Sequence, residues 1–162
     1  MTSEISLRDI NDGDLPVFFE QQLDPEAIRM AAFPPRDHDT FMAHWAKIKA
    51  DETTIVKTII FNGRVAGNIV NWEQAGERKV GYWLGKEYWG RGIASAALSQ
   101  FLAQVKARPL HAHVAKNNLA SIRVLQKCGF TISGEAKFLG VDGEQGEEFI
   151  LTLGASDRDK VE

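Results

Sequence analysis

Cysteine is almost absent from this sequence, because Cys128 is the only one among 162 residues. One thiol cannot build an internal disulfide framework, and such scarcity is typical of proteins from a reducing compartment. The sequence also lacks an apolar run of about 18 residues that could cross a membrane, and its first residues lack the basic and apolar blocks of a secretory signal. We therefore expect a cytoplasmic protein with no membrane partner.

The sequence has no excess of positive charge either. Lys and Arg number 19 against 22 Asp and Glu, which gives a formal net charge of −3. This balance argues against a broad phosphate-binding surface, so we expect no nucleic acid partner. A composition of 44% hydrophobic and 25% charged residues is typical of a globular protein. We expect a single domain over residues 1–155 and a flexible tail over residues 156–162.

The pattern of apolar residues changes twice along the chain. Residues 12–22, 24 onward and 39–49 favour helices after a short strand at 5–7, with a loop at 33–38 that could border a cleft. Strands are predicted at 53–61, 64–72 and 78–84, joined by Asn62-Gly63 and by Gln74-Ala75-Gly76. The remainder predicts helices at 93–105 and 119–128, and strands at 110–114, 130–141 and 147–153, the last two joined at Asp142-Gly143. Gly81, inside a strand, predicts a bulge or a close backbone approach.

These elements predict an α+β fold with a mixed sheet of about six to seven strands flanked by helices. The sheet begins as an antiparallel meander and continues as β-α-β-α-β. Exposed edges of such a sheet make a homodimer reasonable.

A glycine-rich turn carries the strongest chemical signal. It joins a predicted strand to a predicted amphipathic helix through Trp89-Gly90-Arg91-Gly92-Ile93-Ala94. A helix that begins here directs unpaired backbone N–H groups and the positive end of its dipole at one small concavity. Gly90 and Gly92 remove side chains that would block an anion, and Arg91 adds a positive charge. We therefore predict an anion-binding site, although the same glycines could simply form a tight turn.

Two common phosphate-binding motifs do not fit this turn. The spacing from Gly85 to Gly92 approaches that of a P-loop, but Arg91 replaces the lysine and Gly92 replaces the Ser or Thr that binds magnesium. A dinucleotide fingerprint would require G-x-G-x-x-G, and Ser95 stands where its third glycine would be. A nucleotide-phosphate binder of another class is therefore disfavoured.

Two blocks resemble the GNAT (Gcn5-related) N-acetyltransferases. The turn is similar to the acetyl-CoA diphosphate loop of this family, usually Gln/Arg-x-x-Gly-x-Gly/Ala, although Trp89 occupies the Gln/Arg position. Gly-Tyr-Trp-Leu before the loop and Asn118-x-x-Ser121-x-x-Val124-Leu125-x-Lys127-x-Gly129-Phe130 after it are similar to the RimJ/RimL branch. The resemblance covers residues 53–153 well, whereas residues 1–50 match only in being helical.

The resemblance implies acetyl-CoA as the acyl donor and assigns its contacts. Backbone groups of Tyr82, Trp83 and Leu84 would bind the pantetheine arm, in a slot between the splayed strands 78–84 and 110–114. The diphosphate would bind the amides of six consecutive residues, namely Trp89, Gly90, Arg91, Gly92, Ile93 and Ala94. Asn118 would contact the cofactor, cap its helix, or do both.

The resemblance also defines the catalytic candidates. Many members carry a tyrosine proton donor seven residues after the asparagine, but this chain has Leu125 there. Ser121 is then the candidate that hydrogen-bonds or protonates the leaving thiolate, unless it only satisfies its helix backbone. The base that accepts the ammonium proton is open among Glu73, Glu135, His113 and a chain of waters.

Other chemically active side chains predict little. His111 and His113 share a strand face, but no third ligand cluster accompanies them, so we expect no metal. Cys128 is expected to be a small buried apolar residue and not an acyl-enzyme nucleophile. Trp83 and Trp89 are expected to flank the cofactor and Trp45 and Trp72 to pack, although Trp72 could line an acceptor pocket.

The sequence as a whole predicts an N-acetyltransferase that passes an acetyl group directly to a primary amine. The acceptor stays open among a protein N-terminus, a polyamine, an amino acid and an aminoglycoside. A non-catalytic CoA-binding module of the same fold is the alternative, because the tyrosine is missing and no base is identified.

Overall fold

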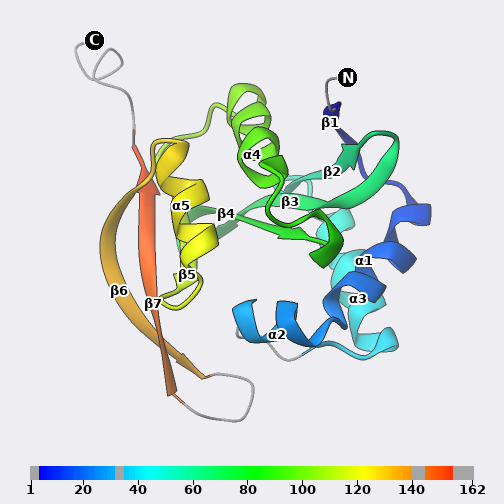
Figure 1. Ribbon diagram of the computed structural model, residues 1–162, viewed down its shortest axis with the longest axis horizontal. Helices are drawn as coiled ribbons and strands as arrows, with labels where there is room; N and C mark the ends of the chain where they lie inside the picture. Colours follow the sequence, from blue (N-terminus) through cyan, green and yellow to red (C-terminus); the bar gives the residue numbers. More distant parts are fainter. Residues whose placement is uncertain (1–3, 32–34, 140–144, 155–162) are drawn as a thin grey trace.

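A seven-stranded mixed sheet forms the centre of the molecule in the computed structural model, which describes residues 4–31, 35–139 and 145–154 (Figure 1). The strand order is β1-β2-β3-β4-β5-β7-β6. The strands are Ile5–Asp9 (β1), Ile55–Phe61 (β2), Arg64–Gln74 (β3), Glu77–Leu84 (β4), Leu110–Ala115 (β5), Thr131–Leu139 (β6) and Gln145–Leu153 (β7). The predicted α+β class and strand number are confirmed.

Helices cover both faces of the sheet. They are the 3-10 helices Asp12–Asp14 (η1) and Lys86–Tyr88 (η2) and the α-helices Leu15–Gln22 (α1), Pro25–Ala31 (α2), His38–Ala50 (α3), Ile93–Gln104 (α4) and Leu119–Lys127 (α5). Helices α4 and α5 pack on one face over the main core, which includes Ile69, Phe101 and Leu110. Phe18 of α1 and Trp45 of α3 pack on the other face in a smaller core. No described helix is long and apolar enough to span a bilayer.

The predicted helix at 12–22 begins as a 3-10 turn. Residues 33 and 34 of the expected loop at 33–38 lie outside the described residues, residues 35–37 form no helix or strand, and α3 starts at His38. The predicted hairpin turn Asp142-Gly143 and the tail 156–162 lie outside the described residues.

Strands β4 and β5 form a parallel pair that separates soon after it starts. Only Arg78 and Lys79 pair with Leu110 and His111, respectively. From Val80 to Leu84 no described strand pairs with the edge of β4 on the β5 side, and we call this opening the gap. The predicted splay is therefore confirmed. Beyond β5 the sheet is antiparallel, because β7 lies between β5 and β6, a position that the sequence did not predict.

The close backbone approach predicted at Gly81 occurs instead at Gly67. A Cβ on Gly67 would lie 2.0 Å from the Trp83 carbonyl oxygen, so the backbones of β3 and β4 meet there. A Cβ on Gly81 would lie 3.5 Å from its nearest neighbours, which belong to the Trp72 ring, and the register of β3 with β4 is unbroken. The bulge lies instead opposite Ile59 and Ile60.

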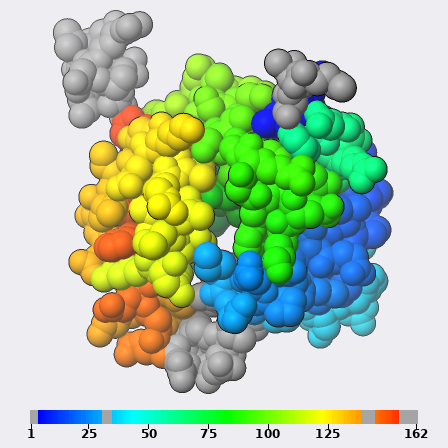
Figure 2. All heavy atoms as spheres, viewed as in Figure 1, coloured from blue at the N-terminus to red at the C-terminus, as the bar shows by residue number. Residues whose placement is uncertain are grey.

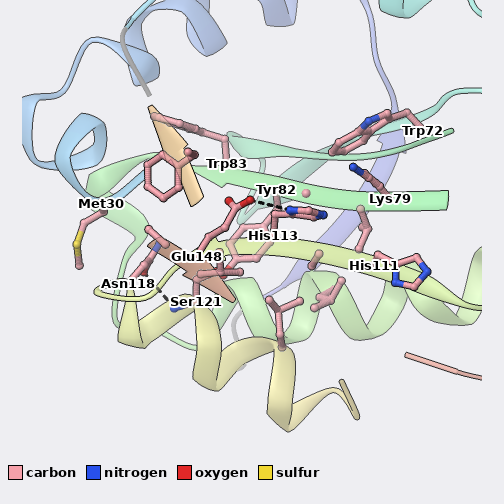
Figure 3. A pocket seen from close by; sticks show the side chains of 18 of the residues that line it. Met30, Trp72, Lys79, Tyr82, Trp83, His111, His113, Asn118, Ser121 and Glu148 are labelled. Atoms are coloured by element: carbon pink, nitrogen blue, oxygen red, sulfur yellow. Dashed lines mark hydrogen bonds and ion pairs between the residues drawn. The ribbon is translucent and has the colours of Figure 1, made fainter. Parts of the chain in front are cut away.

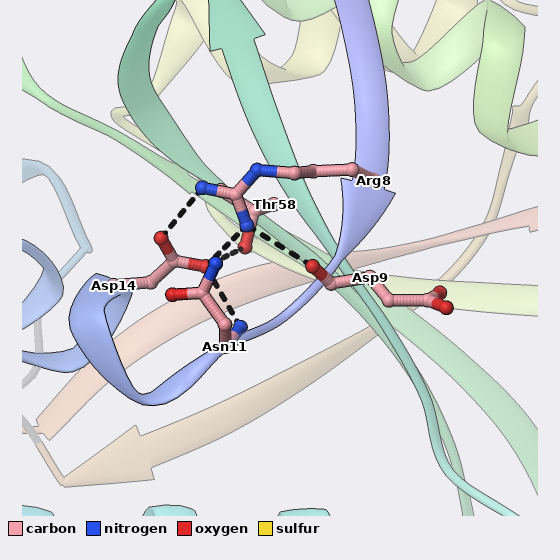
Figure 4. A network of polar contacts seen from close by, with 5 residues as sticks. All are labelled: Arg8, Asp9, Asn11, Asp14 and Thr58. Atoms are coloured by element: carbon pink, nitrogen blue, oxygen red, sulfur yellow. Dashed lines mark hydrogen bonds and ion pairs between the residues drawn. The ribbon is translucent and has the colours of Figure 1, made fainter.

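One buried carboxylate joins the first strand to the sheet (Figure 4). The two terminal guanidinium nitrogens of Arg8, Nη1 and Nη2, each donate to one carboxylate oxygen of Asp14 at 2.8 Å. The Thr58 hydroxyl and the Asn11 backbone N–H donate to Oδ2 of the same carboxylate at 2.7 and 3.0 Å, respectively. The Asp14 side chain is 3% exposed. Burial alone would raise the pKa of Asp14, but the bonds from Arg8, Asn11 and Thr58 hold it below its usual range.

We expect Asp14→Ala to lower the free energy of unfolding at pH 7 by about 3 kcal/mol, because it removes a buried charge and leaves its donors unpaired. Since the folded pKa lies below the unfolded one, this stabilisation is present above the unfolded pKa and is lost as pH falls through the folded pKa. Urea denaturation should show the difference from the unsubstituted protein shrinking below about pH 4. Asp9→Ala is the control, because Asp9 is 88% exposed and should leave the midpoint nearly unchanged. Equal stability of Asp14→Ala and the unsubstituted protein at pH 7 would contradict the assignment.

Candidate active site

The loop between β4 and α4 presents free backbone donors. Gly90 and Gly92 have φ of +73° and +76°, a left-handed conformation that favours glycine. Gly92 is the N-cap of α4 and has no side chain that could cap the first N–H groups of the helix. Within the described chain, the N–H groups from Gly90 to Ser95 have no hydrogen-bond partner. The backbone geometry required for the predicted anion site is therefore present.

The structure changes two details of the predicted loop, namely the Trp89 N–H and the position of the Arg91 charge. The Trp89 N–H is not available to a ligand, because it donates to the Lys86 carbonyl at 3.1 Å in the turn of η2. The Arg91 guanidinium lies 5.9 Å from the centre of the Phe61 ring, and Arg91 does not line the adjacent cavity. Trp89 does line it, and its indole N–H donates to the Leu84 carbonyl at 2.9 Å.

A cavity of about 410 Å³ opens in front of this loop, and we call it the loop cavity. Figure 2 shows the surface hollowed between α2, α5 and the loop. Leu84, Ile93 and Ala94 line it as expected, together with Gly90 and Gly92. Its positive charges come from Arg123 and Lys127 of α5, which sequence reasoning missed. Their spacing of four residues on a predicted helix was the available signal.

Ser121 faces a tyrosine across the loop cavity. The Tyr82 hydroxyl of β4 donates to the Ser121 Oγ of α5 at 3.0 Å, and both residues line the loop cavity. Burial raises the pKa of the Tyr82 hydroxyl, which therefore stays protonated. The sequence suggested only a backbone role for Tyr82, because nothing local indicates that its ring reaches α5.

Asn118 caps α5, and its position also leaves room for the second role that the sequence allowed. Its Oδ1 accepts from the Ser121 N–H at 3.2 Å, which caps α5. Its Nδ2 has no partner within the described residues, and the residue lines the loop cavity, so the amide can also donate to a ligand.

A second cavity of about 440 Å³ passes through the gap, and we call it the gap cavity. It shares Met30, Tyr82, Trp83, Asn118 and Ser121 with the loop cavity. It also reaches His113 on β5, whose Nδ1 lies 2.8 Å from Oε1 of Glu148 on β7 (Figure 3). The two side chains are 29% and 19% exposed. Because a carboxylate only accepts, Nδ1 donates to Glu148, and Nε2 is the ring nitrogen left for proton transfer.

The other predicted bases lie elsewhere. Glu135 forms an ion pair with Lys116 and lines neither cavity, so its selection as a candidate base is not supported. Glu73 lines a third cavity and not the first two. His111, which the sequence suggested only as half of a metal pair, lines the gap cavity and contacts Thr152 at 3.0 Å and Glu77 at 3.5 Å. No cluster of three or more His, Cys, Asp or Glu that could hold a metal occurs in the described part of the chain.

Cys128 does not line either cavity. Its Sγ lies 3.7 Å from the Ser95 carbonyl oxygen, and burial raises the pKa of its thiol. A protonated thiol outside the cavities is a poor nucleophile. Trp83 lines both cavities, Trp45 packs in the smaller core, and Trp72 lines the gap cavity.

Comparison with known proteins identifies a domain family. The sequence profile of the Acetyltransferase (GNAT) domain matches residues 4–131. YdaF of Bacillus subtilis strain 168, provisionally named a ribosomal N-acetyltransferase, is 26% identical over 106 residues, which cover 61% of this chain. That alignment spans 58% of the length of YdaF.

Solved structures share the fold at low identity. Spermidine N-acetyltransferase from Vibrio cholerae, in complex with CoA and spermine, superposes with a TM-score of 0.81 at 16% identity, covering 93% of this chain and 95% of that one. RimJ from Mycobacterium smegmatis, in complex with CoA-disulfide, superposes with a TM-score of 0.76 at 22% identity, covering 93% and 82%.

Proposed function

The chain belongs to the GNAT acetyltransferase family, and from that premise we propose that it is an acetyl-CoA-dependent N-acetyltransferase of the RimJ/RimL-like branch that acts on a primary amine. The observation that carries the proposal is a continuous path. Free amides at the start of α4 open into the loop cavity, which meets the gap cavity at Ser121, and the gap cavity reaches His113.

The residues present fit acetyl-CoA. The N–H groups from Gly90 to Ser95 would bind the diphosphate, and Arg123 and Lys127 would supply positive charge. The edge of β4 from Tyr82 to Leu84, which is not paired with β5, would bind the amides of the pantetheine arm, as an additional strand would. Asn118 would donate its Nδ2 to the same arm.

Acetyl-CoA supplies the acetyl group as a thioester, so the amine nitrogen forms a bond to the carbonyl carbon while the carbon–sulfur bond breaks. The amine loses a proton in this reaction, and His113 would accept it at Nε2, because Nδ1 is bonded to Glu148. Glu148 holds the proton on Nδ1 and stabilises the imidazolium that results.

The departing sulfur needs a donor, and Ser121 provides it. Tyr82 donates to Ser121 Oγ, so the hydrogen of Ser121 itself is free to face the cavity. The raised pKa of Tyr82 makes it a hydrogen-bond donor and a weak acid. We therefore assign Tyr82 as a positioning residue that orients the Ser121 hydroxyl toward the sulfur, in place of the tyrosine whose position Leu125 occupies.

Tyr82→Phe is expected to lower kcat about five-fold, which corresponds to the loss of one hydrogen bond of about 1 kcal/mol. Ser121→Ala should lower kcat further, and the double variant should be no slower than Ser121→Ala, because the tyrosine acts through the serine. The dissociation constant of acetyl-CoA, measured by calorimetry, should stay unchanged in Tyr82→Phe. Additive losses in the double variant would contradict the coupling.

Release of free CoA thiol tests the proposed function directly. Purified protein is mixed with acetyl-CoA and a panel of amines and N-terminal peptides, and thiol is measured with time. Release that requires an amine supports the enzyme. Tight binding of acetyl-CoA with no release from any amine would favour a non-catalytic CoA-binding module, and absence of binding would refute the site.

A further inference from the structure

A third cavity, of about 520 Å³, lies between the sheet and helices α1 and α3, and we call it the aromatic cavity. It shares Trp72, Gly81, Tyr82 and Trp83 with the gap cavity, so the two adjoin across β4. Gly81 and His113 both line the gap cavity. The aromatic cavity therefore adjoins the cavity that contains the proposed base.

Gly81 leaves a passage between two tryptophans. Trp72 and Trp83 lie on either side of it, and a Cβ on Gly81 would already meet the Trp72 ring at 3.5 Å. Beyond this passage the lining includes the rings of Phe18, Phe41 and Trp45. Such a lining favours a flat or bulky apolar group.

Asn68 contributes a polar side chain to the lining of the aromatic cavity. It lies opposite Trp83 in the pairing of β3 with β4, lines the cavity and is 7% exposed. Its side-chain amide makes no hydrogen bond to any described residue. The Asn68 amide atoms are not among the fully buried polar atoms that lack a partner, so they open to the cavity, where a ligand can donate to or accept from them.

The charged side chains that line the gap cavity and the aromatic cavity do not suit a polycation. The described lining contains equal numbers of cationic and anionic side chains, which are Arg36, Lys47 and Lys79 against Asp51, Glu73 and Glu148. Glu148 is already paired with His113. A second or third ammonium group would therefore find no unopposed cluster of carboxylates.

Resting on the proposed function, we propose that the acceptor is a primary amine joined to a bulky apolar group. The amine lies at His113, and the apolar group passes over Gly81 into the aromatic cavity. Where the acceptor carries an amide, that amide bonds to Asn68. An arylalkylamine and a peptide with an aromatic N-terminal residue share this chemistry.

The test measures acceptor binding by calorimetry without acetyl-CoA, so that it does not depend on turnover. The probes are 2-phenylethylamine, the tripeptide amide Phe-Ala-Ala and spermidine. At least one aromatic probe should bind, and the one that does identifies the source of the amine. Gly81→Val should weaken that binding about ten-fold or more by filling the passage, whereas Gly81→Ala, whose methyl group makes an ordinary contact, should change it little.

Asn68→Leu distinguishes an arylalkylamine acceptor from a peptide acceptor. It removes the polar group at similar size, so it should weaken the peptide and leave 2-phenylethylamine unchanged or tighter. Spermidine binding as tight as that of the aromatic probes, no binding of either aromatic probe, or no effect of Gly81→Val would overturn the proposal. A separate titration of acetyl-CoA into Gly81→Val should give the affinity of the unsubstituted protein. If acetyl-CoA binds neither the unsubstituted protein nor Gly81→Val, the proposed function is refuted instead.

Discussion

Gly92→Asp should raise the dissociation constant of acetyl-CoA by at least about 100-fold, which corresponds to about 2.7 kcal/mol. Gly92 has φ of +76°, which costs a residue with a Cβ about 1–2 kcal/mol. The added carboxylate would also stand at the N-terminus of α4, where the free amides otherwise meet the diphosphate, and would repel it. Titration calorimetry measures the change.

Gly63→Asp is the matched control for this experiment. Gly63 has φ of +83° in the turn between β2 and β3, and like Gly92 it has no atom within 4 Å of a Cβ position. The same substitution there adds the same charge and a similar backbone strain outside the loop cavity. Acetyl-CoA should bind this variant as it binds the unsubstituted protein. Equal weakening in both variants would show that strain, and not the anion site, causes the loss.

His113→Gln should lower kcat about 100-fold or more, because glutamine can hydrogen-bond to Glu148 but cannot take the proton of the amine. The dissociation constant of acetyl-CoA should change little, since His113 lies in the gap cavity and not in the loop cavity. Initial rates of thiol release at saturating substrates measure the effect.

His111→Gln controls for the loss of an imidazole from the same face of β5. His111 also lines the gap cavity, but its Nδ1 and Nε2 face Thr152 and Glu77, respectively. We expect the rate of His111→Gln to stay within about three-fold of the unsubstituted enzyme, because the substitution removes at most one ordinary hydrogen bond and not the proposed base. An unchanged rate in His113→Gln would instead indicate that water, and not His113, accepts the proton of the amine.

Local features of the site were predictable from the sequence. The left-handed glycines before α4 and the Asn118 cap of α5 depend on residues close in sequence, and both are present. The free amides follow directly from a helix that begins at a glycine. The meander was equally predictable, because Asn62-Gly63 selects a two-residue hairpin.

The remaining features depend on contacts between distant segments. Glu148 meets His113 only because β7 lies beside β5, and the pattern of β6 and β7 is compatible with either order. Tyr82 reaches Ser121 because β4 and α5 pack together, 39 residues apart in sequence. Trp89 was misassigned because the η2 turn consumes its N–H, and the segment Lys86–Tyr88 gave no signal for a 3-10 turn.

The early separation of β4 from β5 has a consequence for how the donor and the acceptor bind. The gap cavity includes Leu98 and Leu125 from one face of the sheet and Trp72 and His113 from the other, so it is a window through the sheet. In the proposed mechanism the donor enters on the side of α4 and α5 and the acceptor on the side of α1 and α3. Both can occupy the protein together, and double-reciprocal rate plots should intersect, as a ternary complex requires.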